Sequence, residues 1–406
     1  MTDAPQHTTT PVDIAIFGGG IAGLWLANLL TQRGYSCVLL ERDTLGGQQT
    51  LLSQGILHGG LKYALGGALS HESEAIAGMP DRWRASLAGE GDLDLRGVRV
   101  LSDTQHLWSA GSLASRFTTF FASRMLRGRI QKLKFNQYPS ALHDKAFRGN
   151  VYRLDDLVLD TESLVRELAA PIQDRCLHID PKNTTLHWCA DGLARIDLPG
   201  LSLLPTRTLL AAGNGNAALL AEAGEHDLAT DIRAQARPLQ MVLVQHRMPH
   251  RLYAHCIGAS NKPRLTVTTH EQPDGALVWY LGGDLAERGV EMTEDALIRA
   301  ARAELADLFP WLDFSDAELA TVRIDRAEPH QTALVKPDNA YAEARGRLLV
   351  TWPTKLTLTP DLGDRVLALL ARDQATPAHP QPALPASLPR AQPGRPVWYR
   401  LFGHEA

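Results

Sequence analysis

Residues 12–42 read VDIAIFGGGIAGLWLANLLTQRGYSCVLLER, and their pattern is the strongest indication of the fold. Residues 12–17, apolar except for Asp13, predict a strand that is buried on both faces, as in a parallel sheet. Residues 21–33 predict a helix that Gly34 ends, and residues 36–40 predict a second strand. A strand, a helix and a strand in this order predict a βαβ unit, so we expect an α/β protein.

The turn between the first strand and the helix carries three spaced glycines, Gly18, Gly20 and Gly23. Gly18 permits a tight turn, Gly20 lets a pyrophosphate approach the backbone, and Gly23 lets the helix pack closely on the strand. The helix N-terminus adds amide donors and a positive dipole. Glu41 ends the second strand, where its carboxylate can accept both ribose hydroxyls. The pattern indicates dinucleotide binding with a free 2′-hydroxyl, which favours FAD or NAD over NADP.

Composition and charge exclude several classes of protein. The 406 residues carry a formal net charge of −4, which argues against a nucleic-acid binder that works through an overall positive field. The four cysteines are scattered without a C-x-x-C pair, so we expect a reducing compartment and no metal site. We see no run long enough to span a membrane and no secretory signal at 1–11. We therefore expect a cytoplasmic protein, and peripheral contact with the inner face of a membrane stays open.

The rest of the chain divides by its local patterns. The glycine-rich segment 46–67 has interleaved apolar residues, which favours an ordered segment buried against a ligand. Residues 70–150 are expected to be mainly helical. Between 240 and 283, the segments MVLVQHR, LYAHCIG, RLTVTTH and ALVWYLGG are separated by turn residues and predict an antiparallel sheet. Thr161 and Thr359 are expected to cap helices.

The C-terminal residues 375–406 are rich in proline, which predicts an extended linker. They end in the apolar cluster VWYRLF at 397–402. We expect this cluster to dock, either on its own chain or on a partner.

Four segments, in this order along the chain, resemble the D-amino-acid-oxidase-like FAD-dependent oxidoreductase superfamily. They are the opening 13–50, SQGILHGGLKY at 53–63, Ala-Ala-Gly at 211–213 and Lys-Leu-Thr at 355–357. The second and fourth are similar to segments of FAD-dependent glycerol-3-phosphate dehydrogenases. The second also resembles a segment of L-2-hydroxyglutarate dehydrogenases.

The resemblance implies a Rossmann-like FAD-binding domain of the glutathione-reductase type with an inserted antiparallel-sheet substrate domain. The FAD-binding domain would comprise 11–85, 150–230 and 325–372. The substrate domain would comprise 86–149 and 231–324, with 375–406 as a proline-rich tail. FAD is the implied cofactor. Its implied contacts are Gly18, Gly20, Ile21, Ala22, Gly23, Glu41, Arg42, Gly47, Gln49, Thr50, Ser53, Gly213, Lys355, Leu356 and Thr357.

Four residues are candidates for the chemistry in this reading. His58 can be a proton acceptor, a flavin contact or a covalent flavin attachment point. Tyr63 can hydrogen-bond the substrate, since a phenol both donates and accepts. Lys355, with turn amides and a helix N-terminus, would stabilise the negative charge of a reduced flavin. Arg326 would bind a substrate carboxylate, or pair structurally with a neighbouring acid.

The chain departs from the superfamily pattern at two places. Where a Gly-x-Arg-Pro segment is common, this chain reads Asp-Arg-Ala-Glu-Pro at 325–329, with Glu328 in the arginine position. A carboxylate that faced a phosphate would repel it, which argues against glycerol 3-phosphate as substrate. The family's Lys-Gly-Ser-His strand has no matching histidine at 240–243, unless His246 or His255 takes that role.

These observations predict hydride transfer from a small substrate to flavin N5, from the CH–OH group of a 2-hydroxy acid or polyol derivative. An amino-acid or secondary-amine oxidase or dehydrogenase is one alternative. A flavin-bearing binding or assembly protein without turnover is another. The expected partners are a small-molecule substrate and an electron acceptor, which is a quinone, oxygen or a redox protein.

Overall fold

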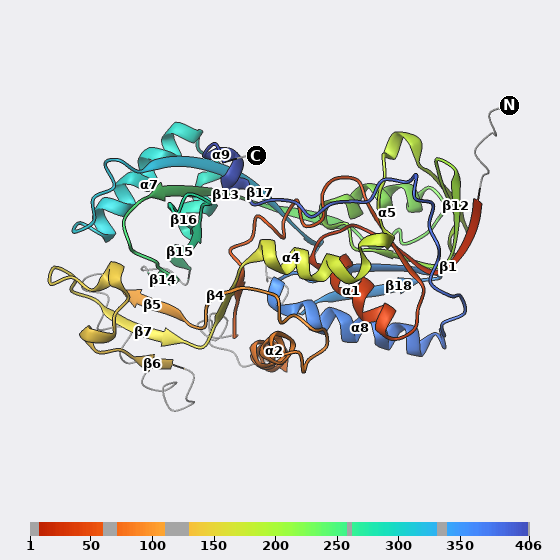
Figure 1. The fold of residues 1–406 in the computed structure, drawn as a ribbon, viewed down its shortest axis with the longest axis horizontal. Coiled ribbons are helices and arrows are strands. Elements are labelled where there is room, and N and C mark those ends of the chain that lie inside the picture. The colour runs from red at the N-terminus through yellow and green to blue at the C-terminus, as the bar shows by residue number, and fades with distance from the viewer. Residues whose placement is uncertain (1–7, 60–70, 110–129, 258–261, 331–338, 405–406) are drawn as a thin grey trace.

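The computed structural model describes residues 8–59, 71–109, 130–257, 262–330 and 339–404. Within these residues the chain forms two eight-stranded sheets and a small three-stranded sheet. Figure 1 shows the first large sheet with β1 and β12 in one half of the molecule and the second, with β13 to β16, in the other half. The mixed α/β class expected from the sequence is confirmed.

The first sheet contains the predicted βαβ unit. Its order is β10-β11-β12-β1-β2-β9, with β19 beside β12 and β18 beside β19. The pairs β1–β12, β1–β2, β2–β9 and β12–β19 are parallel. Its strands are β1 (Thr8–Phe17), β2 (Cys37–Glu41), β9 (Cys176–His178), β10 (Thr185–Cys189), β11 (Gly192–Leu198), β12 (Leu201–Leu210), β18 (Tyr341–Arg345) and β19 (Leu348–Trp352).

Both faces of the first sheet are covered, which explains why residues 14–17 are apolar at successive positions. Ile14 and Ile16 lie in one core cluster, and Ala15 and Phe17 lie in the cluster on the opposite face. The first cluster includes residues of α1 (Ile21–Gln32), α2 (His71–Leu87), α4 (Thr161–Ala169) and α8 (Thr359–Arg372). The second includes residues of α5 (Asn216–Gly224).

The second sheet confirms the antiparallel strands expected at 240–283. Its order is β17-β13-β16-β15-β14-β5-β7-β6, and of these pairs β14–β5 is parallel. Helices α6 (Asp284–Gly289) and α7 (Glu294–Leu308) pack on one of its faces. Its strands are β5 (Gln105–Ser109), β6 (Ile130–Lys132), β7 (Asn150–Leu154), β13 (Ala234–His246), β14 (Ala254–Ile257), β15 (Pro263–Glu271), β16 (Leu277–Gly282) and β17 (Glu318–Pro329).

The three-stranded sheet brings distant segments together, in the order β3-β8-β4. Its strands are β3 (Ile56–Leu57), β8 (Leu157–Leu159) and β4 (Val100–Ser102). Short helical turns complete the chain: η3 (Phe135–Gln137), η4 (Ser140–Leu142), η5 (Ala170–Arg175), η6 (Pro181–Asn183), η7 (Gly213–Gly215), η8 (Leu356–Leu358) and α9 (Val397–Leu401). The pairing of β3 with β8 fixes His58 beside Asp156, since these two residues border the paired strands.

Three local predictions were wrong. Asp160, not Thr161, caps α4, and its carboxylate accepts a hydrogen bond from the Ser163 backbone. Thr359 is the first residue of α8 and donates its hydroxyl hydrogen bond to the Leu356 carbonyl, so it does not cap the helix. The segment 70–150 holds one α-helix, α2, among its described residues and then continues through strands β4 to β7.

The C-terminal segment is not a linker. Its apolar end forms α9 and packs on its own chain against the second sheet, as one of the two expected alternatives had it. The domain boundaries stay a prediction; β7 and the whole of β17 belong to the second sheet.

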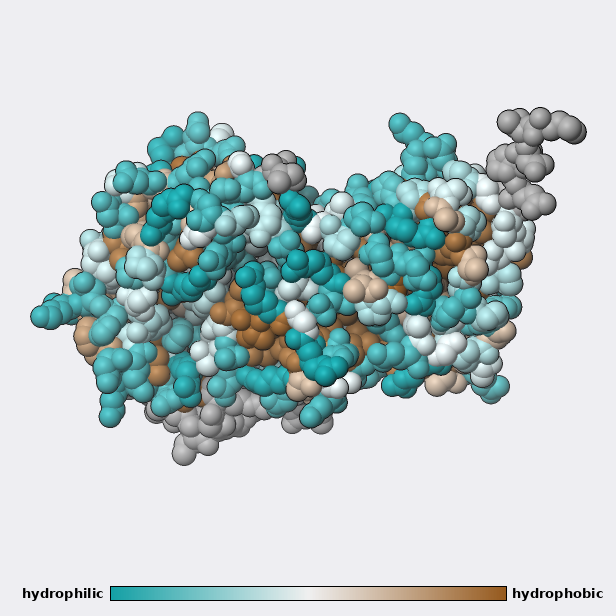
Figure 2. Space-filling view, in the orientation of Figure 1, coloured by the Kyte–Doolittle hydropathy of each residue, from teal (hydrophilic) through white to brown (hydrophobic). Residues whose placement is uncertain are grey.

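The described surface is largely hydrophilic in the view of Figure 2, and hydrophobic residues come to that face mainly in the middle. No helix in the described part of the chain combines the length and the apolar character needed to cross a membrane. Peripheral membrane contact stays a prediction.

Candidate functional site

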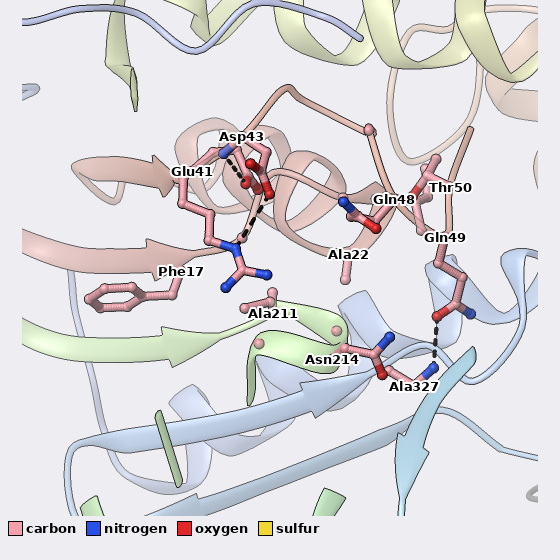
Figure 3. Close-up of a pocket in the computed structure, with 18 of the residues that line it drawn as sticks. Phe17, Ala22, Glu41, Asp43, Gln48, Gln49, Thr50, Ala211, Asn214 and Ala327 are labelled. Carbon is pink, nitrogen blue, oxygen red and sulfur yellow. Dashed lines mark hydrogen bonds and ion pairs between the residues drawn. The ribbon is translucent and has the colours of Figure 1, made fainter. Parts of the chain in front are cut away.

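A cavity of about 500 Å³ lies at the carboxyl ends of the parallel strands of the first sheet (Figure 3). Ligands of open α/β sheets bind at this edge. The cavity is bounded by the turn after β1, by the loop 42–53, by η7 after β12 and by the segment after β19. Of the predicted cofactor contacts, these line it: Gly18, Gly20, Ile21, Ala22, Glu41, Arg42, Gly47, Gln49, Thr50, Ser53, Gly213, Lys355 and Leu356.

The glycines of the turn are required by close backbone packing. Gly18 has a φ of 104°, and a Cβ there would lie 2.4 Å from the Ala212 Cα. A Cβ at Gly23 would lie 1.8 Å from the carbonyl oxygen of Gly18. Gly23 therefore supports the turn from beneath and is not among the cavity-lining residues. A Cβ at Gly20 would meet only the Thr50 hydroxyl, at 3.4 Å, so the space beside this backbone opens toward the cavity.

Glu41 holds the turn as well as lining the cavity. Its Oε2 accepts a hydrogen bond from the Gly19 amide at 2.6 Å, and its Oε1 accepts one from the Asp43 amide at 2.8 Å. Beside it, Arg42 pairs with Asp43 at 3.4 Å. Each carboxylate oxygen can accept a second hydrogen bond, so Glu41 can hold the backbone and a ribose hydroxyl together.

The loop 42–53 is tied to α1 and to the second sheet. The Thr50 hydroxyl accepts a hydrogen bond from the Ile21 amide at 2.9 Å, at the N-terminus of α1. The Gln49 side chain accepts one from the Ala327 amide of β17 at 2.9 Å (Figure 3). These contacts place the loop across the mouth of the βαβ unit.

The opposite wall comes from the segment between β19 and α8. Thr354 has a φ of 59°, an unusual conformation for a β-branched residue. The Lys355 amide donates to the Pro353 carbonyl at 2.7 Å across this residue. The strained turn sets Lys355 and Leu356 into the cavity wall directly before the N-terminus of α8. Thr357 is buried behind them, and its hydroxyl accepts a hydrogen bond from the His58 amide at 2.9 Å.

A group of side chains, which we call the histidine cluster, lies next to this wall. It consists of His58, Asp156 and His255. His58 Nδ1 lies 3.3 Å from Asp156 Oδ2, and the Gly59 amide donates to the other oxygen of the same carboxylate at 2.8 Å. The imidazole of His255 stacks on that of His58, with 5.5 Å between ring centroids, and its Nδ1 lies 2.8 Å from the Thr266 hydroxyl.

Of the two histidines considered for the missing family position, the structure brings His255 to the site and not His246. His246 is buried on the other face of the second sheet, beside Trp279 and Phe314. Burial, together with the nearby His250, lowers its pKa to about 4. Tyr63 lies outside the described residues.

Arg326 and Glu328 lie on one face of β17, since alternate residues of a strand share a face. Neither lines the cavity; Ala327 between them does. Glu328 is buried and accepts hydrogen bonds from Arg237 at 2.7 and 3.0 Å and from Gln235 at 2.7 Å. Arg326 Nε donates to the Arg237 carbonyl at 3.4 Å. The carboxylate in the family's arginine position thus has its own cation on the neighbouring strand.

The family model described as FAD dependent oxidoreductase matches residues 13–326. The chain belongs to the family of FAD-dependent oxidoreductases. A relative from Pseudomonas aeruginosa, described as a probable FAD-dependent oxidoreductase, is 50% identical over 402 residues, which are 98% of this chain and 100% of the relative. The crystal structure of an FAD dependent oxidoreductase from that organism has a TM-score of 0.83 and 45% identity, and covers 97% of this chain and 99% of the other.

More distant structures share the fold. Glycine oxidase from Geobacillus kaustophilus has a TM-score of 0.65 at 17% identity, over 93% of this chain and 97% of the other. L-α-glycerophosphate oxidase from Mycoplasma pneumoniae, in a structure with FAD bound, has a TM-score of 0.61 at 15% identity, over 89% and 95%.

The cavity of this FAD-dependent oxidoreductase fits its cofactor. Bare backbone at Gly20, the N-terminus of α1 and the carboxylate of Glu41 form the combination that a pyrophosphate and a ribose require.

Sequence reasoning missed Asp156 and Arg237, which are distant in the chain from the residues they contact. A signal existed for Asp156, because it directly precedes the apolar segment 157–159 that pairs with β3.

Proposed function

We propose that this FAD-dependent oxidoreductase oxidises a CH–OH group, in a 2-hydroxy acid or polyol derivative, and that His58 accepts the hydroxyl proton. The observation that carries the proposal is the pairing of His58 Nδ1 with Asp156 Oδ2 at 3.3 Å. A carboxylate beside one ring nitrogen orients the imidazole and favours the tautomer whose other nitrogen carries a lone pair. His58, an imidazole with the Asp156 carboxylate beside one ring nitrogen, therefore has the surroundings of a general base.

Alcohols and amines place different demands on such a site. A hydroxyl holds its proton strongly at neutral pH, so its oxidation requires a base at the reacting oxygen. An ammonium group can lose a proton to water before the amine binds. An oriented histidine therefore favours an alcohol. Oxidation of an amino acid or a secondary amine is the second candidate, and it uses the same cavity without needing His58 as base.

A carboxylate on the substrate would be complementary in charge to the arginines of β17 and β13, Arg326 and Arg237. Arg237 neutralises Glu328, so the acid in the family's arginine position would not repel an anionic substrate. Arg326 lies on the same face of the sheet as this pair, opposite Arg237 in the strand register. We assign Arg326 to the substrate carboxylate, and this assignment favours a 2-hydroxy acid over a neutral polyol.

The cofactor contacts expected from the sequence complete the proposal. Gly18, Gly20 and the N-terminus of α1 would hold the pyrophosphate, and Glu41 would hold the ribose. FAD, when bound, supplies the acceptor for the electrons that leave the substrate carbon. Lys355 would stabilise negative charge near the ring system, aided by the dipole of α8. Tyr63 would hydrogen-bond the substrate.

The first experiment is an absorbance spectrum of the purified protein before and after acid precipitation. Flavin in the supernatant means noncovalent FAD, and flavin in the pellet identifies His58 as the first attachment point to examine. The holoenzyme is then assayed with a redox dye against 2-hydroxy acids, polyols, amino acids and secondary amines. Release of ammonia or amine with no oxidation of any hydroxy acid would defeat the alcohol proposal. Oxygen and a soluble quinone, offered in place of the dye, test the acceptor.

The role of the base is tested with His58→Asn and Asp156→Asn. We expect kcat to fall by about 100-fold to 1,000-fold in the first variant and less in the second, with FAD content unchanged. His143→Asn is the matched control, because His143 is exposed directly after η4. A His58→Asn enzyme with full activity would exclude His58 as the base.

A further inference from the structure

The C-terminal strap, residues 375–404, runs along the outside of the first sheet and ends on the second. Figure 1 shows it as the dark blue trace that leaves α8, passes along the molecule and ends in α9. Near its start, the Asp13 carboxylate of β1, which is buried, accepts hydrogen bonds from the amides of Ala378 at 2.9 Å and His379 at 3.1 Å. These contacts anchor the strap to the sheet that carries the cofactor cavity.

The middle of the strap covers β9, the edge strand of the first sheet. The His178 amide donates to the Pro389 carbonyl and the Ala391 amide donates to the Cys176 carbonyl, each at 2.9 Å. The Gln173 side chain donates to the Ala391 carbonyl at 2.7 Å. The strap thereby pairs backbone groups that an exposed edge strand would leave to solvent.

The strap next forms backbone hydrogen bonds with the loop that lines the cofactor cavity. The Leu45 amide donates to the Gln392 carbonyl at 2.9 Å, and the Gly394 amide donates to the Leu45 carbonyl at 2.9 Å. The residues on both sides of Leu45, Thr44 and Gly46, line the cavity. A Cβ at Gly394 would lie 2.7 Å from the Thr44 hydroxyl oxygen and 2.9 Å from the Leu51 side chain, so strap and loop are in direct contact here.

The end of the strap holds the other end of the same loop through the second sheet. Trp398 of α9 is buried, lies 4.3 Å from the His270 ring, and its carbonyl accepts a hydrogen bond from Gln272 at 3.1 Å. Trp398 also packs against Tyr280. The Tyr280 hydroxyl donates to the Leu52 carbonyl at 2.8 Å, next to the cavity-lining Ser53.

We propose that the C-terminal strap is a clamp that holds the loop 42–53 closed over bound FAD, and that FAD leaves the protein when the strap detaches. The strap contacts the loop directly at Leu45 and supports it through Tyr280 at Leu52. A loop fixed at both ends in its binding conformation loses little conformational freedom when the cofactor binds. The clamp depends on FAD as cofactor and not on the substrate class.

The test measures the rate at which FAD leaves the holoenzyme, followed by the rise in flavin fluorescence after dilution. Gly394→Val places a branched side chain between strap and loop, and we expect release about tenfold faster. Ala383→Val is the matched control, because it adds the same side chain at an exposed position of the same strap. The assay needs no substrate, so its outcome is independent of the alcohol proposal.

A second pair of variants tests the other end. Trp398→Ala removes the contact of α9 with His270 and Tyr280 and should also accelerate release about tenfold, while Arg400→Ala, at an exposed position of α9, should not. If Gly394→Val does not fold, the Trp398 pair decides. Variants that keep the wild-type Tm and release FAD at the wild-type rate would overturn the clamp. Equal acceleration by Ala383→Val and Gly394→Val would overturn it too.

Discussion

The cofactor cavity and the histidine cluster beside it are built in opposite ways. The cavity is formed mainly by backbone: Gly18 and Gly20 in a turn that Gly23 supports from beneath, amides at the start of α1, and a loop fixed by main-chain hydrogen bonds. The cluster is formed by side chains from three distant segments, His58, Asp156 and His255. In a site formed by backbone, an added side chain clashes with neighbouring atoms or with the ligand. In a side-chain site, a substitution can remove the chemistry and leave the fold.

The largest effect is expected from a side chain added to the backbone site. Gly23→Val would bring a Cβ within 1.8 Å of the Gly18 carbonyl and force α1 away from the turn. We expect a loss of more than about 3 kcal/mol in the free energy of unfolding and no bound flavin. Denaturant unfolding and flavin content measure both effects.

Gly224→Ala is the control for this variant, because a Cβ there meets nothing within 4 Å. A Gly23→Val protein that binds FAD normally would show that the turn adapts to a side chain. Bare backbone at this turn would then not be required for cofactor binding.

A smaller effect, about 3 kcal/mol, is expected when one partner of a buried ion pair is removed. Arg237→Met leaves the buried Glu328 carboxylate without its cation. The double variant Arg237→Met/Glu328→Gln should recover part of the loss, because no charge is then left buried. Thermal and denaturant unfolding of the single and double variants give the coupling. If the single and the double variant lose the same free energy of unfolding, the hydrogen bond from Gln235 alone is enough for the buried Glu328 carboxylate.

The same contrast between backbone and side chains explains what could be predicted from sequence. The βαβ unit and the glycine turn are local, so their spacing alone predicts them. The pairing of His58 with Asp156 depends on β3 meeting β8, and the pairing of Arg237 with Glu328 depends on the register of β13 and β17. Neither register follows from local patterns. The sequence therefore identified His58 without its carboxylate and Glu328 without its cation.

The C-terminal strap shows a second reason for failure. A proline-rich composition predicts an extended backbone, and the strap is extended, but composition says nothing about what an extended segment contacts. Its partners are single groups such as the Asp13 carboxylate and the Leu45 backbone.

The cap of α4 shows a third limit of local patterns. Two adjacent residues could each cap this helix, and Asp160 takes the position because its carboxylate reaches the Ser163 amide.

Acidification should destabilise the second sheet more than the first, by about 2 kcal/mol for each of His246 and His270 between pH 7 and pH 5. The histidines that are buried among the described residues, His246, His255 and His270, all belong to the second sheet. Burial lowers the pKa of His246 and of His270 to about 4. The unfolded chain, with an ordinary histidine pKa near 6.5, binds these protons first. Stability is therefore full above about pH 6.5 and falls as the pH drops toward 4.

His246→Gln tests this dependence on the face of the second sheet that lies away from the cofactor. The variant should lose less stability than the wild type between pH 7 and pH 5, in chemical denaturation followed at both values. His143→Gln, at an exposed position, should retain the wild-type slope. If the slopes of His246→Gln and the wild type agree, His246 is not held neutral by burial.

The smallest effect is expected at Glu41, whose side chain holds the backbone of the cofactor cavity through hydrogen bonds. Glu41→Gln keeps one acceptor oxygen for the Gly19 amide but replaces the other with a donor that faces the Asp43 amide. We expect FAD affinity to fall about tenfold, with little change in the stability of the apoprotein, because a carboxylate accepts hydrogen bonds more strongly than an amide. Titration of the apoprotein with FAD measures the change, and Glu90→Gln, on the exposed loop after α2, is the control. An unchanged affinity would mean that backbone alone binds the dinucleotide. A loss as large as that of Gly23→Val would mean that Glu41 is needed to form the turn, and the contrast between the two kinds of site would then not hold at this position.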